Sequence, residues 1–136
     1  GENITLKKYS QIENAMDMAQ IYAESFYQVL KYNVIVTDTD KIVAIAGNLK
    51  KKYINMGISE SIERMIERRD TFVERKKKEI EISPGIKEFG YYTVSTIINN
   101  GDSIGAVIIL STETPMLEQE EKLGMILANM LSNYFC

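Results

Sequence analysis

The chain has 136 residues, of which 45% are hydrophobic and 26% charged, and its formal net charge is −3. That balance indicates one globular domain with its own core, and the mild acidity excludes a general electrostatic attraction to nucleic acid or to an anionic membrane. Histidine is absent, so we exclude His-dependent nucleophiles and His-ligated zinc. Cysteine occurs once, as Cys136, which excludes a disulfide framework and leads us to expect a cytoplasmic protein. No apolar run approaches the roughly 20 residues of a membrane span, so we also exclude a transmembrane helix.

The N-terminal quarter is expected to contain a short junction and then a long helix. Residues 1–10 are interpreted as a junction from a preceding domain, and residues 11–136 as the domain itself. Residues 11–32 favour a helix with two adjacent apolar stripes, which indicate either two packing surfaces, a sheet and a partner helix, or one wide face on the chain's own core. One stripe contains Ile12, Met16, Ala19, Ala23, Phe26 and Leu30, and the other contains Ala15, Met18, Tyr22 and Val29.

The middle of the chain alternates between short strands and short helices. Ser59 is a suitable N-cap for the second helix, and Glu79-Ile80-Glu81-Ile82 alternates as a strand does. Pro84-Gly85 then breaks the chain. Strands are expected at 33–38, 42–46, 71–76 and 79–83, and helices at 48–55 and 59–69.

The last third predicts a hairpin followed by a helix. YYTVSTIINNGDSIGAVIILS, residues 91–111, contains Asn100-Gly101, the preferred pair for a two-residue type I′ turn. Thr114 with Pro115 at the first helical position predicts the start of the final helix. Antiparallel hairpins with helices at both ends indicate an α+β domain, in which the terminal helices pack on one face of a single sheet.

Asp38-Thr39-Asp40, in the stretch NVIVTDTDKIVAIAGN, resembles the aspartate pair of phosphoryl-transferring hydrolases. Those enzymes need a parallel, doubly wound sheet, whereas this chain predicts hairpins. A metal site would also need an acidic residue after Gly101-Asp102, and position 106 is alanine. Aspartate is common in turns because it hydrogen-bonds its own backbone, so we interpret the pair as a turn.

Two further features have both a functional and a plain interpretation. RMIERRDTFVERKKK, residues 64–78, could hold a phosphate or carboxylate, but its interleaved acids and edge-strand lysines favour a solvated surface. Thr93 and Ser95 share one face of a central strand. Their hydroxyls could line a small-molecule pocket closed by the 59–69 helix, or could simply fill space and bond to backbone.

Four stretches together resemble a known family. GENITLKKYS, NVIVTDTDKIVAIAGN, KKKYINMGISESIERMIERR and YYTVSTIINNGDSIGAVIILS occur in the same order as in the GAF-like C-terminal domains of stage V sporulation protein T, a family of AbrB-type sporulation transcription regulators. The resemblance covers essentially the whole chain. It implies a GAF/PAS-like antiparallel sheet with the N- and C-terminal helices on one face and short helices over the other.

The resemblance implies regulation rather than catalysis. Members activate and repress forespore genes, and their GAF-like domain is expected to sense an unknown small molecule and to form a homodimer, within a tetramer of the full-length protein. DNA would be bound only through the missing N-terminal domain. No enzymatic activity, metal, cofactor or membrane partner is expected. The alternatives are a purely structural dimerisation module with a filled pocket and a small phosphohydrolase that uses Asp38 and Asp40.

Candidate functional residues follow from these expectations. An anionic ligand group would pair with Arg68 or Arg69, and the hydroxyls would orient it. The candidate ligand-binding residues are Tyr53, Arg68, Arg69, Thr93 and Ser95. The candidate dimer-interface residues are Ile12, Met16, Met18, Tyr22, Leu127, Met130 and Tyr134.

Overall fold

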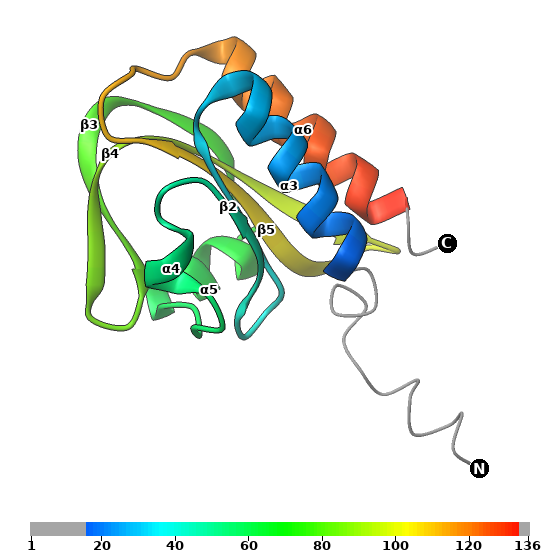
Figure 1. Ribbon diagram of the computed structural model, residues 1–136. Coiled ribbons are helices and arrows are strands. Elements are labelled where there is room, and N and C mark those ends of the chain that lie inside the picture. Colours follow the sequence, from blue (N-terminus) through cyan, green and yellow to red (C-terminus); the bar gives the residue numbers. More distant parts are fainter. Residues whose placement is uncertain (1–15, 134–136) are drawn as a thin grey trace.

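A five-stranded antiparallel sheet with helices on both faces makes up the fold (Figure 1). The structure is a computed structural model and describes residues 16–133. Its strand order is β2-β1-β5-β4-β3. The elements are α3 (Met16–Leu30), β1 (Asn33–Thr37), β2 (Ile42–Ala46), α4 (Lys50–Tyr53), α5 (Glu60–Glu67), β3 (Thr71–Ser83), β4 (Ile86–Asn99), β5 (Asp102–Ser111) and α6 (Glu118–Asn133).

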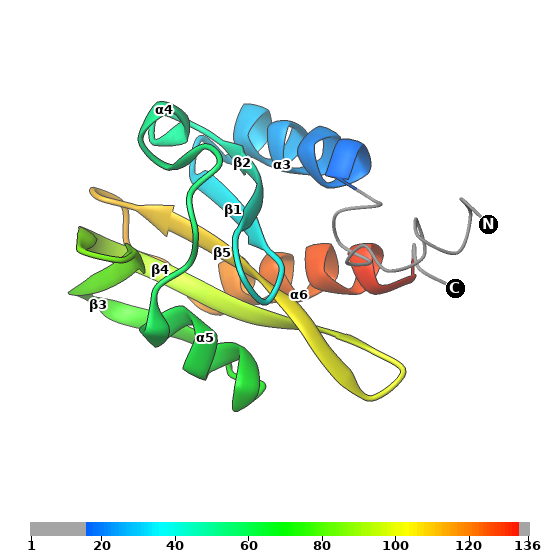
Figure 2. The same cartoon turned by 90° about the horizontal axis from the view of Figure 1, so that it is seen from below.

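The helices are sorted between the two faces as expected. α3 packs on β1 and β2, and α6 packs on β4 and β5, whereas α4 and α5 cover the opposite face. Figure 2, seen from below, shows α5 in front of the strands and α6 behind them. The predicted α+β class, with terminal helices on one side and short helices on the other, is confirmed. The 1–10 junction and the start of the predicted 11–32 helix lie outside the described residues.

Both faces of the central strands are buried, which divides the core into two clusters. Because successive side chains of a strand point to opposite faces, Val34 and Val36 of β1 pack under α3 and α6, while Ile35 packs under α4 and α5. β5 shows the same division, with Val107 and Ile109 on one side and Ile108 on the other. This explains why both strands are almost continuously apolar rather than alternating.

The turns use the residues that their geometry requires. Asn100 and Gly101 have φ angles of 52° and 82°, as a type I′ turn needs, so the predicted hairpin is confirmed. Asp38 Oδ1 accepts hydrogen bonds from the backbone N–H groups of Asp40, at 2.7 Å, and Lys41, at 2.8 Å. The aspartate pair therefore shapes the β1–β2 turn, as we predicted.

Three boundaries differ from the prediction. The predicted strands 71–76 and 79–83 are one strand, β3, whose pairing with β4 shifts register between Glu74 and Lys78. Pro84-Gly85 is the two-residue turn that joins β3 to β4, with Gly85 at a φ of 75°. The predicted helices 48–55 and 59–69 shorten to α4 and α5, although Ser59 does cap α5 by accepting from Ile62 N–H at 3.2 Å.

The final helix begins later than Thr114-Pro115 predicted. The Ser111 hydroxyl accepts the N–H groups of Glu113, at 3.2 Å, and Thr114, at 2.9 Å, which holds that segment in a turn. α6 starts at Glu118, and the Glu120 carboxylate accepts the Leu117 N–H at 2.7 Å. This contact is the reciprocal half of a capping box, in which the third helical residue reaches back to the cap.

α6 approaches the sheet very closely at Gly124. A Cβ atom on Gly124 would lie 2.9 Å from Ser95 Oγ and 3.1 Å from Thr93 Oγ1. Glycine in a helix interior costs about 1 kcal/mol relative to alanine. The close approach is therefore the reason that this position tolerates glycine.

We expect Gly124→Ala to lower the free energy of unfolding by about 1–3 kcal/mol, because overpacking against the sheet outweighs the gain in helix propensity. Urea unfolding followed by circular dichroism measures the change. Adding Ser95→Ala removes the nearer oxygen and is expected to restore most of the loss. A single Gly124→Ala variant more stable than the parent would contradict the packing argument.

Candidate functional site

A buried polar cluster lies under α4, on the face where a ligand was expected. Tyr53 is wholly buried at the end of α4, and its hydroxyl donates a hydrogen bond to Glu88 Oε2 on β4. Lys52 Nζ lies 2.6 Å from the same oxygen. Glu88 is itself 9% exposed. One carboxylate thus ties the four-residue helix α4 to the sheet through two donors.

Aliphatic side chains fill the rest of this face. Tyr53 lies among them, and Phe72 packs edge-on against Tyr92 with ring centres 6.2 Å apart. The space between the sheet and α4–α5 is consequently occupied by the chain's own side chains. The buried isoleucines of this cluster are Ile35, Ile42, Ile45, Ile58, Ile62, Ile66, Ile80, Ile82 and Ile108.

The electrostatics of the cluster favour a neutral phenol. Burial raises the pKa of Tyr53 above its ordinary value of 10.0, and the hydrogen bond to the Glu88 carboxylate raises the pKa further. Deprotonation would place a phenolate against a carboxylate in a dry site, which is why both causes act in the same direction. Lys52 supplies the positive charge that makes a buried Glu88 acceptable.

Arg68 and Arg69 lie at the exposed end of α5, away from Tyr53. Arg68 pairs with Asp70 at 2.9 Å. Arg69 has a φ of 59°, and the N–H groups of Arg69 and Asp70 return to Ile66 and Met65, an arrangement that usually places glycine at this position. The Arg69 guanidinium donates to the carbonyl oxygen of Gly101 in the β4–β5 turn.

Thr93 and Ser95 face α6 rather than α5. Both are buried against Gly124, and their hydroxyls have no hydrogen-bond partner among the described residues. Ser95 also lines a small pocket of about 140 Å³ with Thr71 and Met125. The expectation that these hydroxyls line a pocket closed by the 59–69 helix is therefore wrong, because odd-numbered positions of β4 point to the other face of the sheet. The structure does not bring the five candidate ligand residues together.

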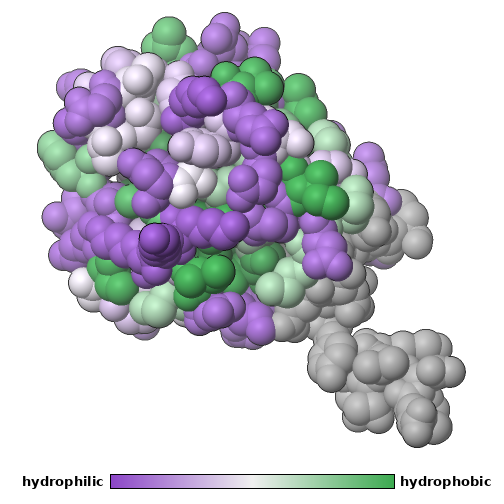
Figure 3. Space-filling view, viewed as in Figure 1, coloured by the Kyte–Doolittle hydropathy of each residue, from purple (hydrophilic) through white to green (hydrophobic). Residues whose placement is uncertain are grey.

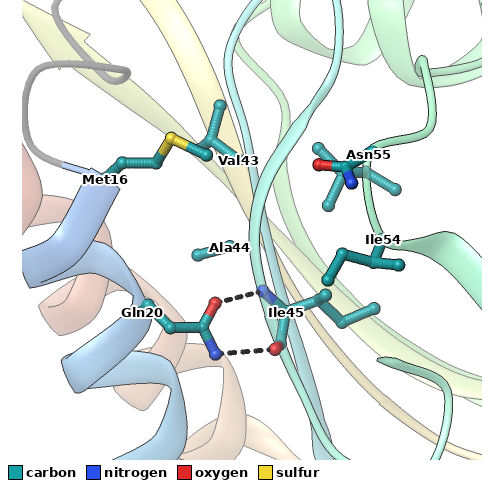
Figure 4. Close-up of a pocket in the computed structure, with 8 residues that line it drawn as sticks. Met16, Gln20, Val43, Ala44, Ile45, Ile54 and Asn55 are labelled. Atoms are coloured by element: carbon teal, nitrogen blue, oxygen red, sulfur yellow. Dashed lines mark hydrogen bonds between the residues drawn. The ribbon is translucent and has the colours of Figure 1, made fainter. Parts of the chain in front are cut away.

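Sequence reasoning missed a pocket at the β2 edge of the sheet (Figure 4). It has a volume of about 110 Å³ and is lined by Met16, Ile54 and Asn55 beside the strand. The Gln20 side-chain amide donates to the Ile45 carbonyl oxygen at 2.8 Å and accepts the Ile45 N–H at 3.1 Å. Gln20 thus replaces a neighbouring strand at this position. Gln20 belongs to neither predicted apolar stripe, and the sequence gave no sign of this role.

Glu88 and Lys52 were also missed. Glu88 lies 35 positions from Tyr53 and 36 from Lys52 in the chain, and no local pattern reveals that α4 and β4 meet. Among residues 16–133, no group of three or more His, Cys, Asp or Glu side chains is placed to hold a metal ion. Within the same residues, none of the helices combines the length and apolarity needed to cross a membrane.

The outer faces of α3 and α6 expose large apolar side chains. Ile21 and Val29 on α3 are 55% and 81% exposed, and Ile126 and Met130 on α6 are 51% and 37% exposed. Each pair shares one helix face, since the members are eight and four residues apart. In Figure 3, hydrophobic side chains form separate green groups along the diagonal that α3 and α6 occupy in Figure 1.

The predicted interface residues are placed differently from one another. Met16 and Met130 are exposed, Met18 is half-buried, and Tyr22 packs against the chain's own core. Leu127 is fully buried and points to the sheet, so it is not available to a partner, and the exposed position beside it is Ile126. Ile12 and Tyr134 lie outside the described residues. Ala19, Ala23 and Phe26 also face the sheet, so the first predicted α3 stripe forms the inward face, joined by Tyr22 of the second stripe.

Sequence comparison gives two agreeing matches. Residues 15–135 match the family described as stage V sporulation protein T C-terminal, transcription factor. The chain is 41% identical over 120 residues to stage V sporulation protein T of Bacillus subtilis (strain 168), a match that covers 88% of this chain and 67% of that protein.

Solved structures show the same fold at low identity. The GAF domain of an Acinetobacter phosphoenolpyruvate-protein phosphotransferase is similar with a TM-score of 0.69 and 12% identity, over 94% of this chain and 83% of that one. The cofactor-binding GAF domain of the nutrient sensor CodY from Clostridium difficile is similar with a TM-score of 0.63 and 12% identity, over 100% and 99% of the two chains. The expected GAF-like fold is confirmed.

We expect Tyr53→Phe to lower the free energy of unfolding by about 1–3 kcal/mol at pH 7, because the buried Glu88 loses one of its two donors. A raised folded-state pKa means that the phenol stabilises the fold fully below pH 10.0 and that this stabilisation is lost as the pH rises further. The parent should therefore lose stability above pH 10 more steeply than Tyr53→Phe. Urea unfolding at pH 7, 10 and 11 tests this, with Tyr27→Phe on α3 as the control. Equal alkaline losses in the parent and Tyr53→Phe would contradict it.

Proposed function

This chain belongs to the stage V sporulation protein T C-terminal family of transcription factors, and from that premise we propose that it is a regulatory domain that self-associates through α3 and α6 and responds to a small molecule. Catalysis is not part of this proposal. The Asp38 carboxylate of the phosphohydrolase alternative is engaged by the backbone of its own turn, in an antiparallel sheet.

The exposed apolar side chains of α3 and α6 carry the proposal of self-association. Both helices on this face of the sheet expose large apolar side chains, and exposed apolar surface gathered on one side of a domain is typical of an interface. Ile21, Val29, Ile126 and Met130 could bury this surface against the same residues of a second copy, in the isologous arrangement that most homodimers use. We propose a dimer of this domain and a tetramer of the longer protein.

A small-molecule response is supported by the short helices that cover the opposite face of the sheet. α4 has four residues and α5 has eight, and the polar attachment of α4 to β4 is made by Lys52 and Tyr53 on Glu88. An effector would act by binding one arrangement of this cover more tightly than another. Tyr53 is its nearest candidate contact, while Arg68 and Arg69 at the end of α5 stay candidates for an anionic group. The solved CodY domain is described as cofactor-binding, which makes this face reasonable to test.

A structural module is the second candidate, and one observation favours it. Tyr53 and the isoleucines fill the α4–α5 face, so binding there requires side chains to move. In that case the domain contributes only self-association to the regulator.

The cellular setting is also proposed from the family. We place the domain in the cytoplasm of the forespore, within a regulator that activates and represses sporulation genes and binds DNA through an N-terminal AbrB-type domain preceding residues 1–10. The matched relative extends beyond the aligned region, which leaves room for such a domain.

We expect a double variant, Val29→Asp with Ile126→Asp, to be a monomer where the parent is a dimer, because two buried carboxylates per copy cannot be accommodated in the interface. Sedimentation equilibrium at micromolar concentrations measures the mass. Phe89→Asp is the matched control, since Phe89 is 58% exposed but lies on β4. A parent that is monomeric, or a double variant that stays dimeric, would contradict the proposal that α3 and α6 form the interface.

We expect at least one class of metabolite to raise the melting temperature of the parent, because a ligand that binds only the folded state stabilises it by mass action. A thermal-shift screen of nucleotides, amino acids and organic acids tests this. Glu88→Gln, which weakens the attachment of α4, should change the size of the response. Unchanged melting across all three classes would favour the structural module.

A further inference from the structure

Four consecutive cations, Arg75 to Lys78, are exposed on β3, an edge strand of the sheet. The sequence alone favoured a plain solvated surface for this run. The structure adds three observations about its charge, its backbone and its aromatic neighbour.

The acids around this run are already neutralised. Lys78 pairs with Glu74 at 3.4 Å, and Lys87 on the neighbouring strand pairs with Glu79 at 3.3 Å. Arg75, Lys76 and Lys77 form no ion pair with any acid of residues 16–133. Three positive charges are thus left unbalanced at one place on a chain whose overall charge is −3.

The backbone displaces these three residues from regular pairing. Glu74 pairs with Tyr92 and Lys78 pairs with Gly90, so β3 takes four steps while β4 takes two. The two additional residues form a bulge, which bends a strand and turns its side chains outward. The three unbalanced cations are the residues within it.

Phe89 adds an exposed aromatic ring beside the cations. It is 58% exposed, and Lys77 Nζ lies 5.5 Å from the centre of its ring. Edge-strand lysines that block unwanted pairing explain the charge but not an exposed phenylalanine among them. The Phe89 ring instead holds the Lys77 ammonium group at the surface beside two further cations, and a cluster of exposed cations is typical of surfaces that contact nucleic-acid phosphates.

We propose that the surface formed by Arg75, Lys76, Lys77 and Phe89, the β3 bulge surface, contacts the phosphate backbone of duplex DNA. The chain belongs to a family of transcription factors, and duplex DNA is the polyanion that such proteins bind. The contact is independent of base sequence, because it uses charge and an apolar ring rather than groups that read base edges. It supplements the affinity of a separate DNA-binding domain and does not replace it.

The test is fluorescence anisotropy of a labelled duplex of arbitrary sequence with the 136-residue chain, at 50 and 200 mM salt. Three phosphate contacts predict that affinity falls about 40-fold between these concentrations, since each contributes a slope of about 0.9 in log affinity against log salt. Arg75→Gln/Lys76→Gln/Lys77→Gln should weaken binding by at least tenfold at 50 mM and remove most of the salt dependence. Phe89→Ala should weaken binding severalfold.

The matched control is Lys31→Gln/Lys51→Gln/Arg64→Gln, which changes the net charge equally at three exposed positions elsewhere. It should bind DNA within about twofold of the parent. Equal losses in both triple variants would show that only net charge matters and would overturn the proposal, as would a parent that does not bind at 50 mM salt. Polyglutamate that displaces the duplex at equal charge concentration would assign the surface to an acidic protein instead, which also overturns it. Circular dichroism melting confirms that each variant is folded.

Discussion

The burial of the central strands on both faces is the constraint on which the rest of this structure depends. β1 and β5 present apolar side chains to both sides, so the sheet needs a cover on each side. On one side two long helices provide it. On the other side the cover is short and irregular, and it depends on a phenol and an ammonium group that meet at one carboxylate, Glu88. Because α4 and α5 cover their face less extensively than α3 and α6 cover the other, a rearrangement of this domain is expected at α4 and α5.

The two faces of the sheet also differ in where the apolar side chains of their helices lie. The α4–α5 side buries its isoleucines against the sheet, and the exposed residues of α4 and α5 are charged. The α3–α6 side fills its own core with small residues such as Ala19, Ala23 and Gly124, which let the helices lie close to the strands, and keeps larger side chains such as Ile21 and Ile126 outside. Close packing inward and apolar residues outward are both expected of helices that serve two layers.

Much of the fold could be predicted from local patterns, because those patterns express backbone chemistry. Asn100-Gly101 and Ser59 each specify a conformation that few other residues allow, and the structure contains both features. The start of α6 could not be predicted, since the Ser111 hydroxyl holds the Thr114 N–H in a turn and the Glu120 carboxylate accepts the Leu117 N–H that a cap at Thr114 could use. The candidate site was harder still. The face to which Thr93 points depends on the register of β4, and Glu88 meets Tyr53 only through tertiary structure.

Gln20 gives α3 a defined axial position on the sheet. Its amide forms two hydrogen bonds with one residue of β2, whereas apolar contacts alone would allow the helix to slide or rotate with little penalty. A displacement of α3 along its axis must therefore either break these two hydrogen bonds or move β2 with the helix. The helix is thereby coupled to the backbone of the edge strand as well as to its side chains.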